Sequence, residues 1–154
     1  MIWRKIEKRL EEFFEAKGRY ALLVDGARQV GKTCSIEEFG RTHYDSVIKI
    51  DFVKTPDAVN LFRDVADESE VLTRISAFAD KAMIPARTLV FFDEVQKCSE
   101  VVTYIKYLVK DDGRFHYVLS GSLLGVTFDC RQPQPRQPSK TSLTPIDIIQ
   151  RYNV

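Results

Sequence analysis

Apolar residues recur at helical spacing at the start of the chain and then give way to short, continuous apolar runs. Within 2–16 the apolar positions lie three or four apart, which predicts an amphipathic helix with one narrow apolar face. The first continuous run, 20–24, is typical of a strand that is buried on both faces. After a glycine-containing stretch, 32–39 is predicted to form a helix that Gly40 ends.

The same two patterns alternate through the next part of the chain. Three continuous apolar runs predict further strands, and three segments with helical spacing predict helices. The predicted strands are 46–52, 88–92 and 115–119, and the predicted helices are 59–65, 69–79 and 101–109. Strands and helices alternate along the chain, and each predicted strand is continuously apolar, as in a buried parallel sheet. The fold class predicted is therefore a layered α/β domain around a parallel sheet.

The composition suits one globular domain. The 154 residues are 44% hydrophobic and 29% charged, which is enough for one core and argues against global disorder. The net charge of +1 gives no support for general nucleic-acid binding. No apolar run reaches the roughly 18 residues that cross a bilayer. The three cysteines lack metal-ligand spacing, so we expect reduced thiols in a cytoplasmic protein.

The segment GARQVGKT, 26–33, lies between the first predicted strand and the following helix. It fits the pattern G-x-x-x-x-G-K-[S/T], in which glycines let backbone N–H groups curl around phosphates at a helix N-terminus. Lys32 would reach the outer phosphates, and the Thr33 hydroxyl would bind Mg²⁺. The alternative is a glycine turn that happens to contain a lysine. The predicted nucleotide contacts are Gly26, Ala27, Arg28, Gln29, Val30, Gly31, Lys32, Thr33 and Cys34, with a surface role as the alternative for Arg28.

Two acids follow the apolar run TLVFF, namely Asp93 and Glu94. Ligands of open parallel sheets bind at the carboxyl ends of the strands, so these acids are expected beside the glycine loop. Asp93 is predicted to hold Mg²⁺ through water and Thr33, and Glu94 to polarise the water that attacks the γ-phosphate. Two solvated acids at a strand end are the alternative, and the upstream loop favours the functional interpretation.

A short polar side chain at the tip of the fourth strand, in SGSLLG, would contact the γ-phosphate and the attacking water. Ser120 and Ser122 are the candidates, the sequence does not choose between them, and an ordinary strand-ending turn is the alternative. No N-K-x-D motif for guanine occurs, which favours ATP over GTP.

Three segments, LLVDGARQVGKT, FFDEVQKCSEVVTYIKYL and YVLSGSLLGV, together resemble the prokaryotic AAA-type P-loop ATPases in which an ATPase core precedes a C-terminal domain of unknown function. The resemblance covers 1–126. It implies an AAA-like sheet, ATP and Mg²⁺ as ligands, and the roles given above to the lysine, threonine and two acids. The acidic strand would then be separated from the loop strand by an extra strand, and would lie beside neither its sequence neighbour nor the sheet edge. A homo-oligomer or a protein partner would belong to the full-length form.

After residue 126 the chain departs from that family. The segment 127–154 holds four of the six prolines, and after Cys130 four basic residues against Asp147 give 4 − 1 = +3. We expect a disordered or polyproline-like tail, and no fifth strand or helical lid. A broken reading frame or truncation, leaving the sheet incomplete at its C-terminus, explains this best, and a proline-rich ligand for a partner is the alternative.

The function predicted is Mg-ATP binding with ATP hydrolysis. Its alternatives are a nucleotide-gated protein-interaction module with little hydrolysis and a truncated, inactive fragment. Nothing in the core supports direct nucleic-acid or membrane binding.

Overall fold

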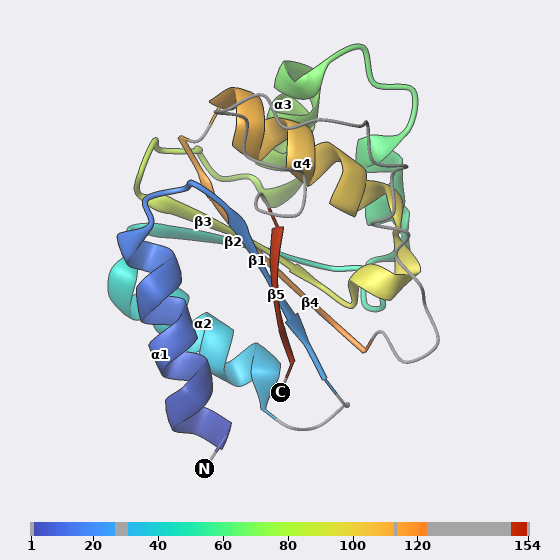
Figure 1. The fold of residues 1–154 in the computed structure, drawn as a ribbon. Coiled ribbons are helices and arrows are strands. Elements are labelled where there is room, and N and C mark those ends of the chain that lie inside the picture. Colours follow the sequence, from blue (N-terminus) through green and yellow to red (C-terminus); the bar gives the residue numbers. More distant parts are fainter. Residues whose placement is uncertain (1, 27–30, 113, 123–148, 154) are drawn as a thin grey trace, which may run out of the picture.

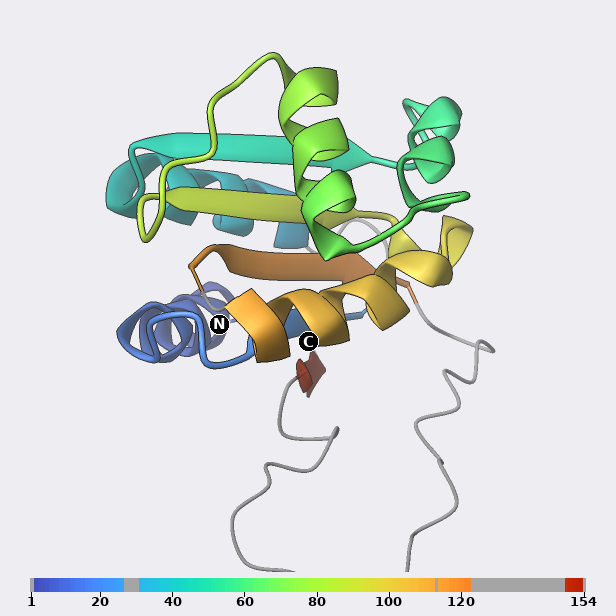
Figure 2. The ribbon, with the colours of Figure 1, turned by 90° about the horizontal axis from the view of Figure 1, so that it is seen from above.

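The computed structural model describes residues 2–26, 31–112, 114–122 and 149–153, which form a parallel five-stranded sheet covered by helices on both faces (Figures 1 and 2). The strands are β1 (Ala21–Asp25), β2 (Ser46–Asp51), β3 (Thr88–Asp93), β4 (His116–Gly121) and β5 (Ile149–Asn153). Their order is β2-β3-β4-β1-β5, and each neighbouring pair is parallel. The α/β class predicted from the apolar pattern is confirmed.

The helices form two layers. The first layer consists of α1 (Ile2–Glu15) and α2 (Lys32–His43), and the second of α3 (Glu68–Ala79) and α4 (Glu100–Asp112) (Figure 1). Two short 3-10 helices, η1 (Pro56–Phe62) and η2 (Val95–Lys97), connect strands to helices in the second layer. Every residue of β3 and β4 is buried between the layers, which is why these strands read as continuous apolar runs. The helix expected over 59–65 corresponds only in part to the 3-10 helix η1, which ends at Phe62.

The sequence predicts that Gly40 ends the second helix, and this prediction is wrong. Helix α2 continues through Gly40 to His43. A Cβ added at Gly40 would lie 2.9 Å from Val47 Cγ2 and 3.0 Å from Leu89 Cδ2. The missing side chain therefore lets α2 pack closely against β2 and β3. A glycine that permits close packing and one that ends a helix look alike in sequence.

The order of the strands corrects one further expectation. Strand β4 separates β1 from β3, so an extra strand does lie between the loop strand and the acidic strand. However, β3 pairs directly with β2, the strand before it in sequence. Strand β2 takes the edge because it carries polar side chains, among them Lys49 and Asp51, and is only partly buried.

The C-terminal strand also differs from the expectation. Ile149–Asn153 is no disordered tail but pairs with β1, from Ala21 opposite Ile149 to Asp25 opposite Asn153. The last proline is Pro145, so every residue of β5 keeps its backbone N–H. The rest of the expected tail, up to residue 148, lies outside the described residues.

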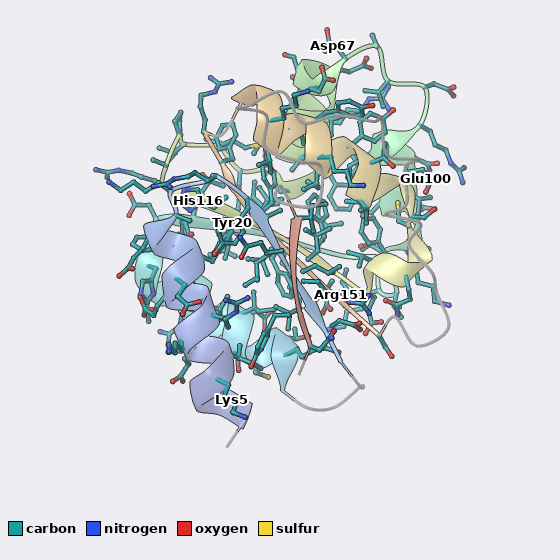
Figure 3. The ribbon with its side chains drawn as sticks, viewed as in Figure 1. Lys5, Tyr20, Asp67, Glu100, His116 and Arg151 are labelled. Atoms are coloured by element: carbon teal, nitrogen blue, oxygen red, sulfur yellow. The ribbon has the colours of Figure 1, made fainter. Side chains whose placement is uncertain are left out.

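A side-chain contact also joins β5 to β1. Arg151, which is labelled in Figure 3, donates to Asp25 Oδ2 through Nε at 3.1 Å and through Nη2 as well. Asp25 is buried, whereas the side chain of Arg151 is half exposed. Because a buried carboxylate is costly without a compensating positive charge, this contact stabilises the edge of the sheet next to the glycine loop.

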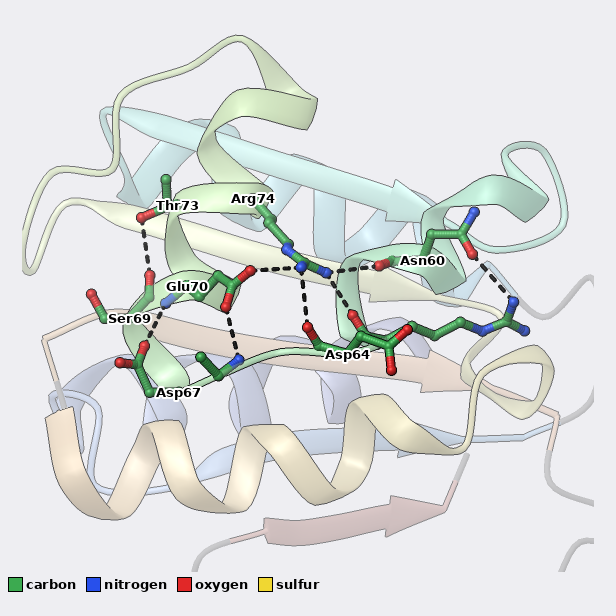
Figure 4. Close-up of polar contacts among 9 residues, drawn as sticks. Asn60, Asp64, Asp67, Ser69, Glu70, Thr73 and Arg74 are labelled. Carbon is green, nitrogen blue, oxygen red and sulfur yellow. Dashed lines mark hydrogen bonds and ion pairs between the residues drawn. The ribbon is translucent and has the colours of Figure 1, made fainter.

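Arg74 holds the connection between β2 and β3 in place (Figure 4). Its guanidinium donates to the carbonyl oxygens of Asn60 at 3.2 Å and Arg63 at 2.7 Å, and to Glu70 Oε1 at 2.6 Å. Asp67 accepts a hydrogen bond from the Glu70 N–H at 2.9 Å and thereby caps α3. These contacts join the end of η1 to the first turns of α3.

A buried histidine lies at the amino ends of the strands, opposite the end that carries the glycine loop (Figure 3). His116 begins β4 and shares a hydrogen bond of 2.6 Å between its Nδ1 and the Tyr44 hydroxyl. The rings of Phe13 and Phe14 meet it edge-on, with centroids 5.8 and 6.3 Å away. Burial lowers the pKa of His116, so the folded protein favours the neutral imidazole.

We predict that His116 makes the folded protein less stable as the pH falls from 7 to 5. The unfolded chain binds a proton near the ordinary pKa of 6.5, whereas burial lowers the pKa in the folded protein. The unfolded state therefore holds more protons below pH 6.5, and acid shifts the equilibrium toward it. His116→Asn should make the free energy of unfolding, measured with urea at several pH values, less dependent on pH in this range. An unchanged slope would contradict the prediction.

We predict that Arg151→Met lowers the melting temperature by about 2–4 °C, because Asp25 stays buried and loses this partner. Thermal denaturation followed by circular dichroism measures the change. Gln150→Met removes a polar side chain from the same strand and is the matched control. Equal melting temperatures for the two variants would show that the Arg151–Asp25 contact adds nothing to stability.

Candidate functional site

The glycine loop lies between the carboxyl end of β1 and the first residue of α2. The Gly26 N–H donates to the Gly121 carbonyl oxygen at 3.3 Å, which joins the start of the loop to the end of β4. Gly31, at φ 82° and ψ 13°, has a left-handed conformation that favours glycine. The four residues between these glycines, Ala27, Arg28, Gln29 and Val30, lie outside the described residues. The loop thus turns directly into a helix, as its pattern predicts.

Lys32 places a positive charge inside this turn. Its side chain is buried, and Nζ donates to the carbonyl oxygens of Gly26 and, at 3.3 Å, Gly121. Burial lowers the pKa of Lys32, and the nearby carboxylates of Glu94, Asp25 and Asp93 oppose that shift. The lysine from the loop and the acids from β3 therefore share one electrostatic environment.

Thr33 and Asp93 are in direct contact, although 60 residues separate them in sequence. The Thr33 hydroxyl donates to Asp93 Oδ2 at 2.9 Å, and Asp93 Oδ1 accepts from the Glu94 N–H at 3.0 Å. Burial raises the pKa of Asp93; the hydrogen bond from Thr33 lowers it, and the charges of Asp51 and Glu94 raise it further. A cation beside Asp93 would favour its ionised form.

Glu94 leaves the strand in an unusual conformation. Its φ of 59° and ψ of 46° lie in the left-handed region, which is uncommon for a residue with a side chain. The carboxylate accepts a hydrogen bond from Gln96 Nε2. Nothing in the sequence singles out Gln96, because an amide two residues after a glutamate matches no general pattern.

The two serines differ in position. Ser120 is fully buried on β4, opposite Asp93 in register, and its Oγ has no hydrogen-bond partner within the part of the chain that the structure describes. Ser122 follows the strand and is partly exposed. Cys34 is an exposed thiol in the first turn of α2. Only Ser120 is thus both buried and next to the acidic strand.

The donor set fits one kind of metal. Among the described residues, no cluster of three or more histidine, cysteine, aspartate or glutamate side chains is arranged to hold an ion. The Thr33 hydroxyl and the Asp93 carboxylate supply hard oxygen ligands instead. Mg²⁺ is commonly bound by one or two carboxylates together with water and the phosphates of a substrate, so the residues fit magnesium that arrives with a phosphate ligand. Within the described ranges no helix is long and apolar enough to span a membrane.

Known proteins resemble this chain in sequence pattern and in fold. A family model for an AAA domain matches residues 18–148. The solved structure of Drosophila ORC bound to DNA is similar with a TM-score of 0.53 and 12% identity, covering 97% of this chain and 91% of that one. The structure of C. elegans PCH-2 is similar with a TM-score of 0.52 and 13% sequence identity, and the match covers 97% of this chain and 41% of that one. No curated protein sequence matches significantly. At these identities the two structures show a shared fold alone.

Proposed function

The chain belongs to the AAA domain family, and on this premise we propose that it binds Mg-ATP and hydrolyses the nucleotide. The observation that carries the proposal is the hydrogen bond of 2.9 Å between Thr33 and Asp93, because it brings the glycine loop and the acidic strand together at one edge of the sheet. Lys32 and Glu94 flank this contact in sequence and interact electrostatically with each other.

In the proposed complex, Lys32 exchanges its carbonyl contacts for phosphate oxygens. Loops of this sequence pattern bind phosphates through backbone N–H groups, and the N-terminus of α2 adds a favourable dipole. The residues proposed to contact the nucleotide are Gly26, Ala27, Arg28, Gln29, Val30, Gly31, Lys32, Thr33 and Cys34. The absence of an N-K-x-D motif in the sequence supports ATP rather than GTP.

Thr33 and Asp93 are proposed to hold Mg²⁺, and their mutual hydrogen bond orients both side chains before the metal arrives. When bound, Mg²⁺ would supply positive charge that offsets the negative charge developing on the phosphates during phosphoryl transfer. Asp93 contributes a full negative charge at the metal, and Thr33 contributes a neutral oxygen.

Glu94 is proposed to orient the attacking water and accept its proton. Ser120 is proposed to contact the γ-phosphate, because its buried hydroxyl has no partner among the described residues and is level with Asp93 in the sheet. Ser122 is the second candidate for this contact. Lys32 stabilises negative charge on the transferred group.

The two cysteines that the structure describes are free thiols, Cys34 and Cys98. Burial raises the pKa of Cys98 to about 11, which keeps this thiol protonated and unreactive. We therefore propose a reducing compartment, the cytoplasm, for this domain. Assembly with copies of itself or with a protein partner is the proposed context in which this domain acts.

Lys32→Ala is predicted to abolish Mg-ATP binding in isothermal titration calorimetry, because it removes the buried cation that faces the phosphates. Lys110→Ala removes an exposed lysine from α4 and serves as the control, which should bind like the unaltered protein. Equal affinities for the two variants would contradict the assignment of the loop.

Glu94→Gln is predicted to keep Mg-ATP affinity within about threefold and to reduce phosphate release by about 100-fold or more, as expected when a general base is lost. Glu15→Gln, at the exposed end of α1, is the control. Undiminished turnover would remove Glu94 from its role. If the unaltered protein binds Mg-ATP tightly without turnover, this result would instead indicate a nucleotide-gated interaction module. If it does not bind Mg-ATP at all, this result would indicate an inactive fragment.

A further inference from the structure

We propose that Gln96 positions both Glu94 and the attacking water in the hydrolytic site. This inference rests on the proposed function and deepens it. In this arrangement, Nε2 of Gln96 donates a hydrogen bond to the Glu94 carboxylate. Oε1 of Gln96 accepts a hydrogen bond from one O–H of the water. The same water donates its second O–H to Glu94, so that its lone pair faces the γ-phosphorus.

The hydrogen bonding of Gln96 is incomplete. Its Nε2 donates to Glu94 Oε2, whereas its Oε1 is buried and has no partner among the residues that the structure describes. A buried amide oxygen without a donor is costly, and such groups are uncommon in folded proteins. The oxygen accepts hydrogen bonds only, so the missing partner is an N–H or O–H group. A water molecule held next to Glu94 supplies an O–H group.

The backbone fixes where this amide lies. Gln96 belongs to η2, which begins directly after the left-handed turn at Glu94. Its Oε1 lies against Gly121, where an added Cβ would come within 2.6 Å of it and within 3.2 Å of Val95 Cγ2. Gly121 therefore allows η2 to pack closely on the end of β4, and this packing sets the position of the amide.

The same glycine connects Gln96 to the phosphate-binding loop. The Gly121 carbonyl oxygen accepts hydrogen bonds from Lys32 Nζ at 3.3 Å and from the Gly26 N–H at 3.3 Å. Gln96 thus lies between the carboxylate proposed as the base and the strand end that holds the lysine. In the proposed arrangement, the amide also faces the water that lies between Glu94 and the γ-phosphate.

The chemical step gives the amide a clear role. Glu94 takes the proton that the attacking water loses as its oxygen bonds to the γ-phosphorus and the bond from phosphorus to the bridging oxygen breaks, with ADP keeping the electron pair. Gln96 neither gains nor loses a proton. It holds the carboxylate and the water in the geometry that this transfer needs, which is why its loss should reduce kcat more than affinity.

Two substitutions test the inference. Gln96→Leu has similar size and lacks both polar atoms, and Gln96→Glu keeps the shape but replaces the donor by a carboxylate. Gln150→Leu, on β5, is the matched control. We expect Gln96→Leu to lower kcat for phosphate release by about 10- to 100-fold, with affinity for Mg²⁺ and a non-hydrolysable ATP analogue within about threefold by calorimetry. Gln96→Glu should be as impaired at pH 8 and regain activity toward pH 6. Burial and the like charge of Glu94 favour the protonated form of the introduced carboxyl, which can then donate a hydrogen bond to Glu94.

A second readout does not depend on turnover. The side-chain amide of Gln96 gives a pair of signals in a ¹H–¹⁵N NMR spectrum, identified by their absence in Gln96→Leu. These signals should move when Glu94 is changed to alanine, and again when Mg²⁺ and the ATP analogue are added to the unaltered protein. Signals that stay in place in both experiments would overturn the inference.

The outcomes separate this inference from the proposed function. If the unaltered protein hydrolyses ATP and Gln96→Leu keeps its kcat, Gln96 only fills space and the inference is wrong, while the proposed function stands. If the unaltered protein binds Mg-ATP without releasing phosphate, the proposed hydrolysis and the role of Gln96 toward water are both wrong. If Gln96→Leu melts far below Gln150→Leu, the dependence of kcat on pH in Gln96→Glu decides whether the inference holds. A dependence parallel to that of the unaltered protein overturns it.

Discussion

The parallel register of β1, β4 and β3 is the constraint on which the site depends. These three strands end at the same edge of the sheet, with Asp25 opposite Gly121 and Asp93 opposite Ser120. The sheet can keep this register because β3 and β4 are buried on both faces and carry few polar groups before their ends. These groups are Thr88, which begins β3, His116, which begins β4, and the hydroxyl of Tyr117. Function-bearing groups from distant parts of the sequence are thereby brought together by packing of the apolar core.

The charges at this edge balance one another only in part. Lys32, Asp93 and Asp25 are all buried, and burial disfavours the charged forms of the lysine and of Asp93. The lysine has backbone carbonyls as hydrogen-bond acceptors, and Asp93 has a hydroxyl and an N–H as donors. A phosphate beside Lys32 and a divalent cation beside Asp93 would each favour the charged form of the neighbouring side chain, which is the physical basis for proposing a magnesium–triphosphate ligand.

The sequence predicts the layers and four of the strands because continuous apolar runs have few alternatives to burial in a sheet. It also places the glycine loop and the two acids at one edge, since parallel strands share their carboxyl ends. It fails where one residue type has two uses. Gly40 lies within α2 and allows this helix to pack closely against β2 and β3. The prolines that precede β5 hide a strand of ordinary composition. Gln96 depends on contacts across the fold, with Gly121, that no local pattern encodes.

The most direct test of the central claim is a crystal structure of the protein with Mg²⁺ and a non-hydrolysable ATP analogue. The account predicts that Lys32 Nζ leaves the carbonyl oxygens of Gly26 and Gly121 for phosphate oxygens, and that Mg²⁺ lies beside Thr33 Oγ1 and Asp93. A nucleotide bound at another place, or a metal that contacts neither of these two side chains, would contradict it.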